Sequence, residues 1–217
     1  MNHLLITGPG RSGTTLLVKL LGRLGFDIGE PSLEYFEHAR AGLETDILDP
    51  LAGYVVKDPD LTWRLGPLLN SGRVRREEID WVIVPLRDLE AAAASRIAIT
   101  TDTREVHAPG GLIGTARPGK QPQRLAEMTY GLFEVAARYE LPLILLAYPL
   151  FARDVAYAYR RLFPVLADYS EEEFIAAWNA TIDPTLVRDA GVNVPHLPGM
   201  RVAMLRARLW LKRHLAH

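Results

Sequence analysis

The sequence predicts a three-layer α/β/α domain built on a central parallel sheet. Two observations predict this fold class. Short apolar runs alternate with amphipathic segments through the first two thirds of the chain, which is typical of strand–helix–strand units. The first apolar run is also followed directly by a glycine-rich turn and an amphipathic segment. With 217 residues, the chain is expected to form one domain, residues 1–217, with a helical part from residue 150 onward.

Four short apolar runs are the expected strands. Their residues are apolar without alternation, which indicates strands covered on both faces, as in a parallel sheet. A further short extended piece is a poor strand because charged and glycine residues interrupt it. The four strands are expected at 4–8, 53–57, 79–86 and 143–147, and the extended piece at 26–30.

Helices are expected between and after these strands. Gly25 closes the first helix, and Asp88 and Ser170 are suitable caps for later ones. Pro67 leaves the end of the helix expected over 61–69 undetermined. The segment 103–122 is rich in Gly, Pro and basic residues, and is expected to be a long surface loop or lid. The expected helices cover 14–24, 32–40, 61–69, a segment from 88, 123–139, 151–162, 171–179 and 200–214.

Composition excludes several classes of function. Twenty-five Lys and Arg residues balance 26 Asp and Glu residues, so the charge of −1 gives no reason to expect nucleic acid as a partner. The chain has no cysteine, which excludes disulfides, thiolate catalysis and cysteine-bound metals, and fits a reducing compartment. No apolar run reaches the roughly 18 residues of a membrane span, and the start does not resemble a signal peptide. A cytoplasmic protein is expected.

The turn after the first strand predicts an anion site. Residues 7–15 read T-G-P-G-R-S-G-T-T and lead into a helix. Such a turn aims several backbone N–H groups and the positive end of the helix dipole at one point. A tight strand-to-helix connection with no ligand is the alternative, but it needs neither Arg11 nor three clustered hydroxyls.

The first candidate ligand is a dinucleotide. Gly8, Gly10 and Gly13 satisfy the pattern G-x-G-x-x-G, and Asp27 or Glu30 lies near the distance expected of a ribose-binding acid. That pattern also requires a full apolar second strand ending in the acid. The stretch before Glu30 is a poor strand, which argues against a dinucleotide.

The second candidate ligand is a nucleoside triphosphate. Gly8 and Gly13, followed by Thr14 and Thr15, have the spacing of the phosphate-binding loop G-x-x-x-x-G-K-[ST], which predicts a P-loop NTPase-like fold. Thr14 stands where that loop has the lysine that neutralises the terminal phosphates. Its absence argues against a triphosphate, although a P-loop kinase-like phosphotransferase remains an alternative.

The third interpretation comes from a family resemblance. Residues 9–17, P-G-R-S-G-T-T-L-L, resemble the 5′-phosphosulfate loop of the sulfotransferase family, with Gly10 where proline commonly precedes the basic residue. Arg87 at the end of a strand and Ser95 eight residues later match the family's pair that binds the 3′-phosphate. The resemblance implies 3′-phosphoadenosine-5′-phosphosulfate as co-substrate, no metal, and binding by Gly10, Arg11, Ser12, Gly13, Thr14, Thr15, Arg87 and Ser95.

The resemblance also implies catalytic roles. Lys57 ends the strand 53–57, where a family lysine contacts the leaving phosphate and sulfuryl oxygens, and Arg11 stands beside the bridging oxygen. Pro59 occupies the position of the histidine base of cytosolic members, so the Lys-Asp-Pro form is closer to bacterial members. Glu30 resembles the carboxylate base of other members, with Asp58 and His38 as alternatives.

The expected reaction transfers a sulfuryl group to a hydroxyl of a small-molecule, lipid or carbohydrate acceptor. The family's C-terminal Arg-Lys-Gly segment is not seen, and Arg117 and Lys120 in the segment 103–122 are candidate substitutes. A degenerate nucleotide-binding protein without catalysis is therefore a second alternative. The basic, amphipathic residues 201–217 are expected to pack on the domain, with a membrane surface or a homodimer interface as the other options.

Overall fold

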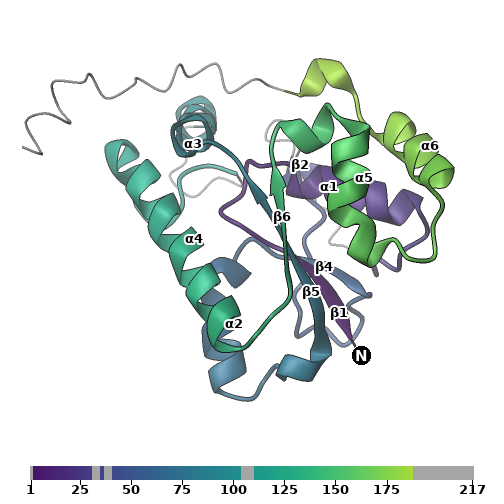
Figure 1. Cartoon of the computed structure of the whole chain (residues 1–217). Helices are drawn as coiled ribbons and strands as arrows, with labels where there is room; N and C mark the ends of the chain where they lie inside the picture. Colours follow the sequence, from purple (N-terminus) through teal and green to yellow (C-terminus); the bar gives the residue numbers. More distant parts are fainter. Residues whose placement is uncertain (1, 31–34, 37–40, 104–109, 188–217) are drawn as a thin grey trace, which may run out of the picture.

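The central feature of the fold is a four-stranded, all-parallel sheet. The computed structural model describes residues 2–30, 35–36, 41–103 and 110–187, and Figure 1 shows the sheet between two groups of helices. Neighbouring strands pair in the order β4-β1-β5-β6, each pair in parallel. The strands are β1 (His3–Ile6), β4 (Val55–Lys57), β5 (Ile79–Leu86) and β6 (Leu143–Ala147).

The strand order creates a reversal of direction in the middle of the sheet. From β1 the chain moves to one neighbour, β4, and then crosses to the other neighbour, β5, before continuing to β6. The connections that leave β1 and β5 therefore run in opposite directions. In open parallel sheets, ligands bind outside the carboxyl ends of the strands at such a reversal.

Helices cover both faces of the sheet, which makes three layers. One face carries α1 (Thr14–Arg23), α5 (Val155–Leu162) and α6 (Glu171–Thr181), and the other α2 (Leu61–Asn70) and α4 (Gln121–Arg138). The helix α3 (Leu89–Thr103) packs on α4 through Ala92, Ala93 and Leu125.

Alternate residues of β1 supply the two cores. Leu4 and Ile6 belong to the core under α1, whereas Leu5 between them belongs to the core under α2, and all three are fully buried. Burying each such side chain contributes about 1.5–3 kcal/mol. This is why an uninterrupted apolar run forms a central strand here.

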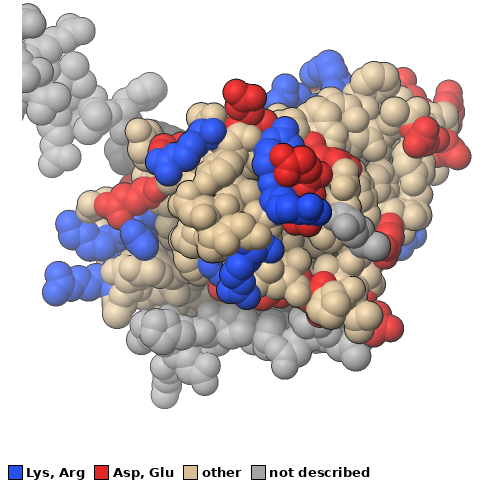
Figure 2. Space-filling view, turned by 90° about the horizontal axis from the view of Figure 1, so that it is seen from below, with Lys and Arg blue, Asp and Glu red and all other residues tan. Residues whose placement is uncertain are grey.

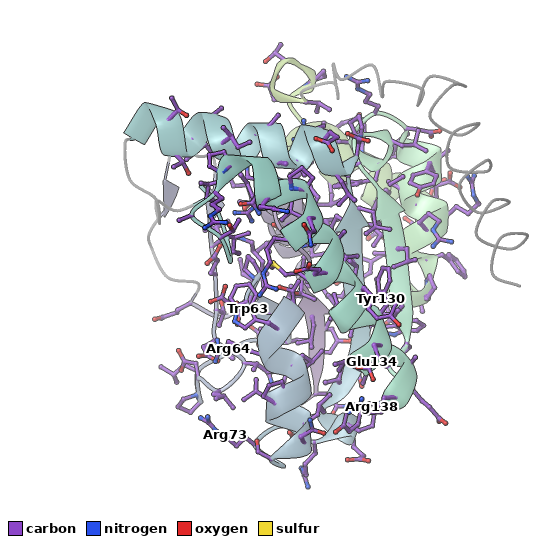
Figure 3. The ribbon with its side chains drawn as sticks, turned by 90° about the vertical axis from the view of Figure 1, so that its left-hand side faces the viewer. Trp63, Arg64, Arg73, Tyr130, Glu134 and Arg138 are labelled. Atoms are coloured by element: carbon purple, nitrogen blue, oxygen red, sulfur yellow. The ribbon has the colours of Figure 1, made fainter. Side chains whose placement is uncertain are left out.

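The helices α2 and α4 lie side by side on the outside of the second layer (Figure 3). Trp63 lies on α2, and Tyr130, Glu134 and Arg138 follow one another along α4 at four-residue spacing. Arg138 and Glu134 form an ion pair one turn apart. Pro67 lies inside the last turn of α2, which it does not end.

The remaining elements are short. A two-stranded antiparallel ribbon lies between α1 and β4, and several 3₁₀ turns join the larger elements. The ribbon consists of β2 (Tyr35–Phe36) and β3 (Ala41–Gly42), and the 3₁₀ turns are η1 (Arg76–Glu78), η2 (Pro118–Lys120), η3 (Leu150–Ala152), η4 (Phe163–Val165) and η5 (Pro184–Leu186).

The structure confirms the predicted fold class and all four predicted strands. The helix predicted over residues 32–40 is wrong at Tyr35–Phe36, which form β2 by pairing with the later residues of β3. The segment 103–122 connects two helices as expected, since α3 ends at Thr103 and α4 begins at Gln121. It does not lie wholly at the surface, because Leu112 is only 5% exposed. The helix expected at 200–214 lies outside the described residues. Within the described part, no helix is both long enough and apolar enough to cross a membrane.

Candidate functional site

The loop between β1 and α1 has an unusual backbone. Gly8, Gly10 and Gly13 have φ angles of 136°, 73° and 87°, which glycine adopts without a steric penalty. Arg11 is also left-handed, with φ of 60°. Thr7 ties the start of this loop to both neighbouring strands, because its N–H donates to Ile83 O at 3.1 Å and its hydroxyl donates to Asp58 O at 2.8 Å. The loop is thereby held at the carboxyl edge of the sheet.

Several polar groups of the loop have no hydrogen-bond partner among the described residues. Within the residues that the structure describes, the N–H groups of Gly10, Ser12 and Gly13 donate no hydrogen bond. The Ser12 hydroxyl also has none, although the residue is only 1% exposed. The first N–H groups of α1 are unpaired by the geometry of every helix start. Unpaired buried donors are costly, and an anion at the positive end of the helix would satisfy them.

The structure brings Arg11, Arg87 and Ser95 together at this loop. Arg11 Nε donates to Ser95 Oγ at 3.1 Å, and an Arg87 guanidinium N–H donates to the carbonyl of Arg11 at 3.0 Å. Arg87 follows β5, and its guanidinium carbon lies 5.3 Å from the centre of the Tyr148 ring at the end of β6. Two guanidinium groups and a hydroxyl thus meet where the connections from β1 and β5 diverge.

Aromatic side chains close the site on the side of β6. A Cβ atom at Gly13 would lie 2.7 Å from Phe151 Cζ and 3.0 Å from Tyr148 Cδ2, so only glycine fits there. The two rings pack with their centres 5.8 Å apart. The loop is therefore backed by rigid packing as well as by its hydrogen bonds.

Lys57 reaches the same region from the end of β4. Its Nζ donates to Gly42 O at 2.7 Å and to Glu44 Oε1 at 3.1 Å, and the residue is only 2% exposed. The Thr15 hydroxyl donates to the same Gly42 carbonyl at 3.4 Å, so Lys57 Nζ lies no more than 6.1 Å from that hydroxyl at the start of α1. Burial lowers the pKa of Lys57, Glu44 opposes that effect, and the charge of Arg11 adds to it.

Of the two alternative bases, Asp58 and His38, only Asp58 lies within the described residues. The Asp58 carboxylate accepts from Asp60 N at 2.7 Å and from Arg64 at 3.0 Å, so both of its oxygens serve the turn between β4 and α2. Burial raises the pKa of Asp58 to about 6, against the opposing hydrogen bond from Asp60. His38 lies outside the described residues.

Glu30 lies at the other end of the sheet. The chain before it runs antiparallel to the start of β4, since Val55 N donates to Asp27 O at 2.8 Å and a Cβ at Gly29 would lie 2.6 Å from Gly53 N. Four residues of extended chain, about 13 Å, separate Gly53 from Lys57. The structure therefore does not bring Glu30 to the loop. Figure 2 shows the face of the molecule seen from below Figure 1, on the side where β1 begins, and Lys and Arg side chains are mixed with Asp and Glu on this face.

Two charged residues at the loop carry no sequence signal and were not predicted. Arg96 is only 4% exposed and donates to the carbonyls of Pro9 and Gly111. Glu44 has a side chain 49% exposed to solvent and forms the ion pair with Lys57. Arg96 follows Ser95 directly, and Glu44 follows the short ribbon that ends at Gly42.

The segment 103–122, which was predicted to be a lid, is linked to the loop through Arg96, which donates to both Gly111 O and Pro9 O. Arg117 and Lys120 are exposed, and Lys120 Nζ donates to Gln123 at 3.3 Å. Neither forms a hydrogen bond or ion pair with the loop in the described part of the chain. Among the same residues, no cluster of three or more His, Cys, Asp or Glu side chains could hold a metal ion.

Comparison of the chain with protein-family models, with curated proteins and with solved structures gave no significant match. The chemistry of the site is therefore what indicates a function. That chemistry is a loop of unpaired N–H groups at a helix start, surrounded by Arg11, Arg87, Arg96 and Lys57.

Proposed function

We propose that this chain is a sulfotransferase. It moves a sulfuryl group from 3′-phosphoadenosine-5′-phosphosulfate to a hydroxyl of a small-molecule, carbohydrate or lipid acceptor, and it does so in the cytoplasm. The observation that carries the proposal is the junction of two anion-binding elements, because Arg11 of the loop bonds to both Ser95 and Arg87. A ligand with phosphate groups at both its 5′ and 3′ positions matches two adjoining sites.

The loop suits the 5′ end of this ligand. The unpaired N–H groups of Gly10, Ser12 and Gly13, together with the Ser12 hydroxyl, would donate to the phosphate and sulfate oxygens. Thr14 is buried where a triphosphate-binding loop has its lysine, so that position supplies no positive charge. The loop therefore favours a less charged group than a triphosphate.

Arg87 and Ser95 suit the 3′-phosphate. Ser95 Oγ accepts from Arg11 and keeps its own proton, which it can donate to a phosphate oxygen. A guanidinium group and a hydroxyl on one phosphate form charge-assisted hydrogen bonds, which are about twice as strong as neutral ones. Selectivity for a 3′-phosphorylated nucleotide would follow from this pair.

The transfer step needs a base and a cation at the reacting atoms. The acceptor oxygen forms a bond to sulfur while the bond from sulfur to the 5′-phosphate oxygen breaks, which yields a sulfate ester and adenosine 3′,5′-bisphosphate. Lys57 and Arg11 would stabilise the charge that develops on the departing oxygen. The acceptor proton goes to Glu44, whose carboxylate lies 3.1 Å from Lys57 Nζ and is half exposed toward arriving acceptor.

Titration calorimetry with adenosine 3′,5′-bisphosphate, ATP and NAD tests this proposal. The bisphosphate should bind, and Arg87→Gln should weaken it by about 10- to 150-fold, the cost of a hydrogen bond to a charged group. The same variant should change the affinity for 5′-AMP, which has no 3′-phosphate, by less than about threefold. Tight ATP binding without any response to the bisphosphate would overturn the proposal in favour of a phosphotransferase.

A further inference from the structure

A buried arginine, Arg96, lies directly under the phosphate loop. Its Nε donates to Pro9 O at 3.1 Å, one terminal nitrogen donates to the same carbonyl, and the other donates to Gly111 O at 2.5 Å. Two N–H groups of the guanidinium thus donate to one loop carbonyl. The hydrogen bonds of Arg96 to described residues all go to backbone carbonyls.

Arg96 forms no ion pair with any residue that the structure describes. Among the described residues no carboxylate lies within 4 Å of its guanidinium group, whereas Arg64 pairs with two carboxylates. Burial and the charge of Arg11 lower the pKa of Arg96 to about 10, while Glu44 and Asp60 act in the other direction. A buried charge without a counter-ion is expensive. A bound anion in the loop would supply the missing negative charge.

The loop is shaped around this side chain. A Cβ atom at Gly10 would lie 2.4 Å from a terminal nitrogen of Arg96, so the backbone comes as close to the guanidinium group as glycine permits. Proline, which the sulfotransferase family commonly has at this position, could not adopt the φ of 73° found at Gly10. Glycine in place of proline at position 10 therefore permits the close approach of the buried arginine.

Arg96 also joins the loop to a firmly held neighbour. The segment that supplies the Gly111 carbonyl is anchored by side chains, because Leu112 N donates to Thr100 Oγ1 at 2.8 Å and Ile113 N donates to Gln121 Oε1 at 3.0 Å. Gln121 is fully buried. The guanidinium group thus braces Pro9 against a rigid part of the second helical layer.

We propose that Arg96 is a positioning residue of the anion site, which holds the Pro9 carbonyl turned into the protein so that the following N–H groups face the ligand. Its fixed charge also attracts the anion from beneath the loop, a role that the lysine has in triphosphate-binding loops. This inference rests on the proposed function for the identity of the natural ligand, but it concerns any phosphate-type anion bound at Gly10–Gly13. Arg96 acts through the loop and does not touch the anion.

Calorimetric binding of inorganic pyrophosphate and of adenosine 3′,5′-bisphosphate to the whole chain tests the inference. Arg96→Gln should weaken pyrophosphate binding by at least about tenfold, the loss expected for a charge-assisted contact, and Arg96→Lys should recover part of that loss. Arg76→Gln is the matched control. Arg76 also donates to two backbone carbonyls, those of Ile79 and Glu140, but at the amino-terminal edge of the sheet.

The stability of each variant and its affinity for pyrophosphate must be measured separately. Circular dichroism should show each variant folded before titration, and Arg76→Gln should lose stability without losing pyrophosphate affinity. If Arg96→Gln does not fold, Arg96→Lys provides the test. Lysine keeps the charge but cannot form both hydrogen bonds to the Pro9 carbonyl. This variant should therefore bind pyrophosphate at least about threefold more weakly than the unmodified protein.

The outcomes separate this inference from the proposed function. If the Arg96 variants bind pyrophosphate as tightly as the unmodified protein, the inference is overturned and the sulfotransferase proposal stands. If the protein binds pyrophosphate but not the bisphosphate, the sulfotransferase proposal falls, and weaker pyrophosphate binding by the Arg96 variants still supports the inference. If the protein binds neither anion, both are overturned.

Discussion

The close contact between Gly10 and Arg96 makes a quantitative prediction about loop stability. Gly10→Ala adds a methyl group 2.4 Å from a guanidinium nitrogen, in a residue whose φ is 73°. Gly72→Ala is a matched control, because Gly72 has a φ of 69° and nothing lies within 4 Å of its Cβ position. Both substitutions impose the same backbone strain and the same loss of unfolded-chain entropy.

The difference between the two variants isolates the cost of displacing Arg96. The left-handed conformation costs a non-glycine residue about 1–2 kcal/mol in either variant. At Gly10 the new methyl group must also push the guanidinium group off the Pro9 carbonyl, and losing a hydrogen bond to a charged group costs about 1.5–3 kcal/mol more. We expect a loss of about 2.5–5 kcal/mol for Gly10→Ala and about 1–2 kcal/mol for Gly72→Ala.

Equilibrium unfolding in urea, extrapolated to water, measures both losses. The m value should stay unchanged, since neither substitution alters the surface exposed on unfolding. Equal losses for Gly10→Ala and Gly72→Ala would refute the reasoning, because they would show that the guanidinium group moves aside without cost.

Three further predictions concern the base, the pH dependence and a helix cap. Glu44→Gln should lower the rate of sulfuryl transfer by about 10²–10⁴ without weakening bisphosphate binding, and Glu30→Gln should leave the rate unchanged; equal effects of the two would contradict the assignment. Because the pKa of Asp58 is raised from 3.8 to about 6, its ionisation opposes folding. The free energy of unfolding should therefore fall by up to about 3 kcal/mol as the pH rises from 4 to 7. Urea unfolding at several pH values should show this slope, and Asp58→Asn should remove it. Ser170→Ala removes the hydroxyl that accepts from Glu173 N at the start of α6, and should cost about 1 kcal/mol in the same assay, so an unchanged midpoint would show that the cap contributes nothing.

Much of the fold was predictable because its elements are local patterns. The apolar runs 79–86 and 143–147 coincide with β5 and β6 at both ends, and Thr14 begins α1 as the glycine-rich turn predicts. Ser170 caps α6, and Asp88 accepts from Ala91 N at the start of α3. The ribbon β2–β3 was missed because each strand has only two residues, and its pairing depends on a partner outside the local pattern.

The candidate site was predictable only in part. Arg11, Arg87 and Ser95 stand in motifs that follow strands, and the carboxyl ends of parallel strands meet at one edge of a sheet. The structure brings these three residues into contact. Arg96 and Glu44 could not be found this way, because an arginine within a helix and a glutamate in a loop are usually solvated charges.

The sequence by itself determined the strands, most of the helices and the shape of the loop, because strand, turn and helix preferences act between residues close in the chain. Only the tertiary structure decided which charges surround that loop. The order β4-β1-β5-β6 sets Lys57 on one side of β1 and Arg87 on the other. The contacts of Asp27 and Gly29 with the start of β4 place Glu30 at the opposite end of the sheet. The burial of Arg96 is likewise a property of the packed layers. It depends on the carbonyl groups of Pro9 and Gly111, which lie far from Arg96 and from each other along the chain.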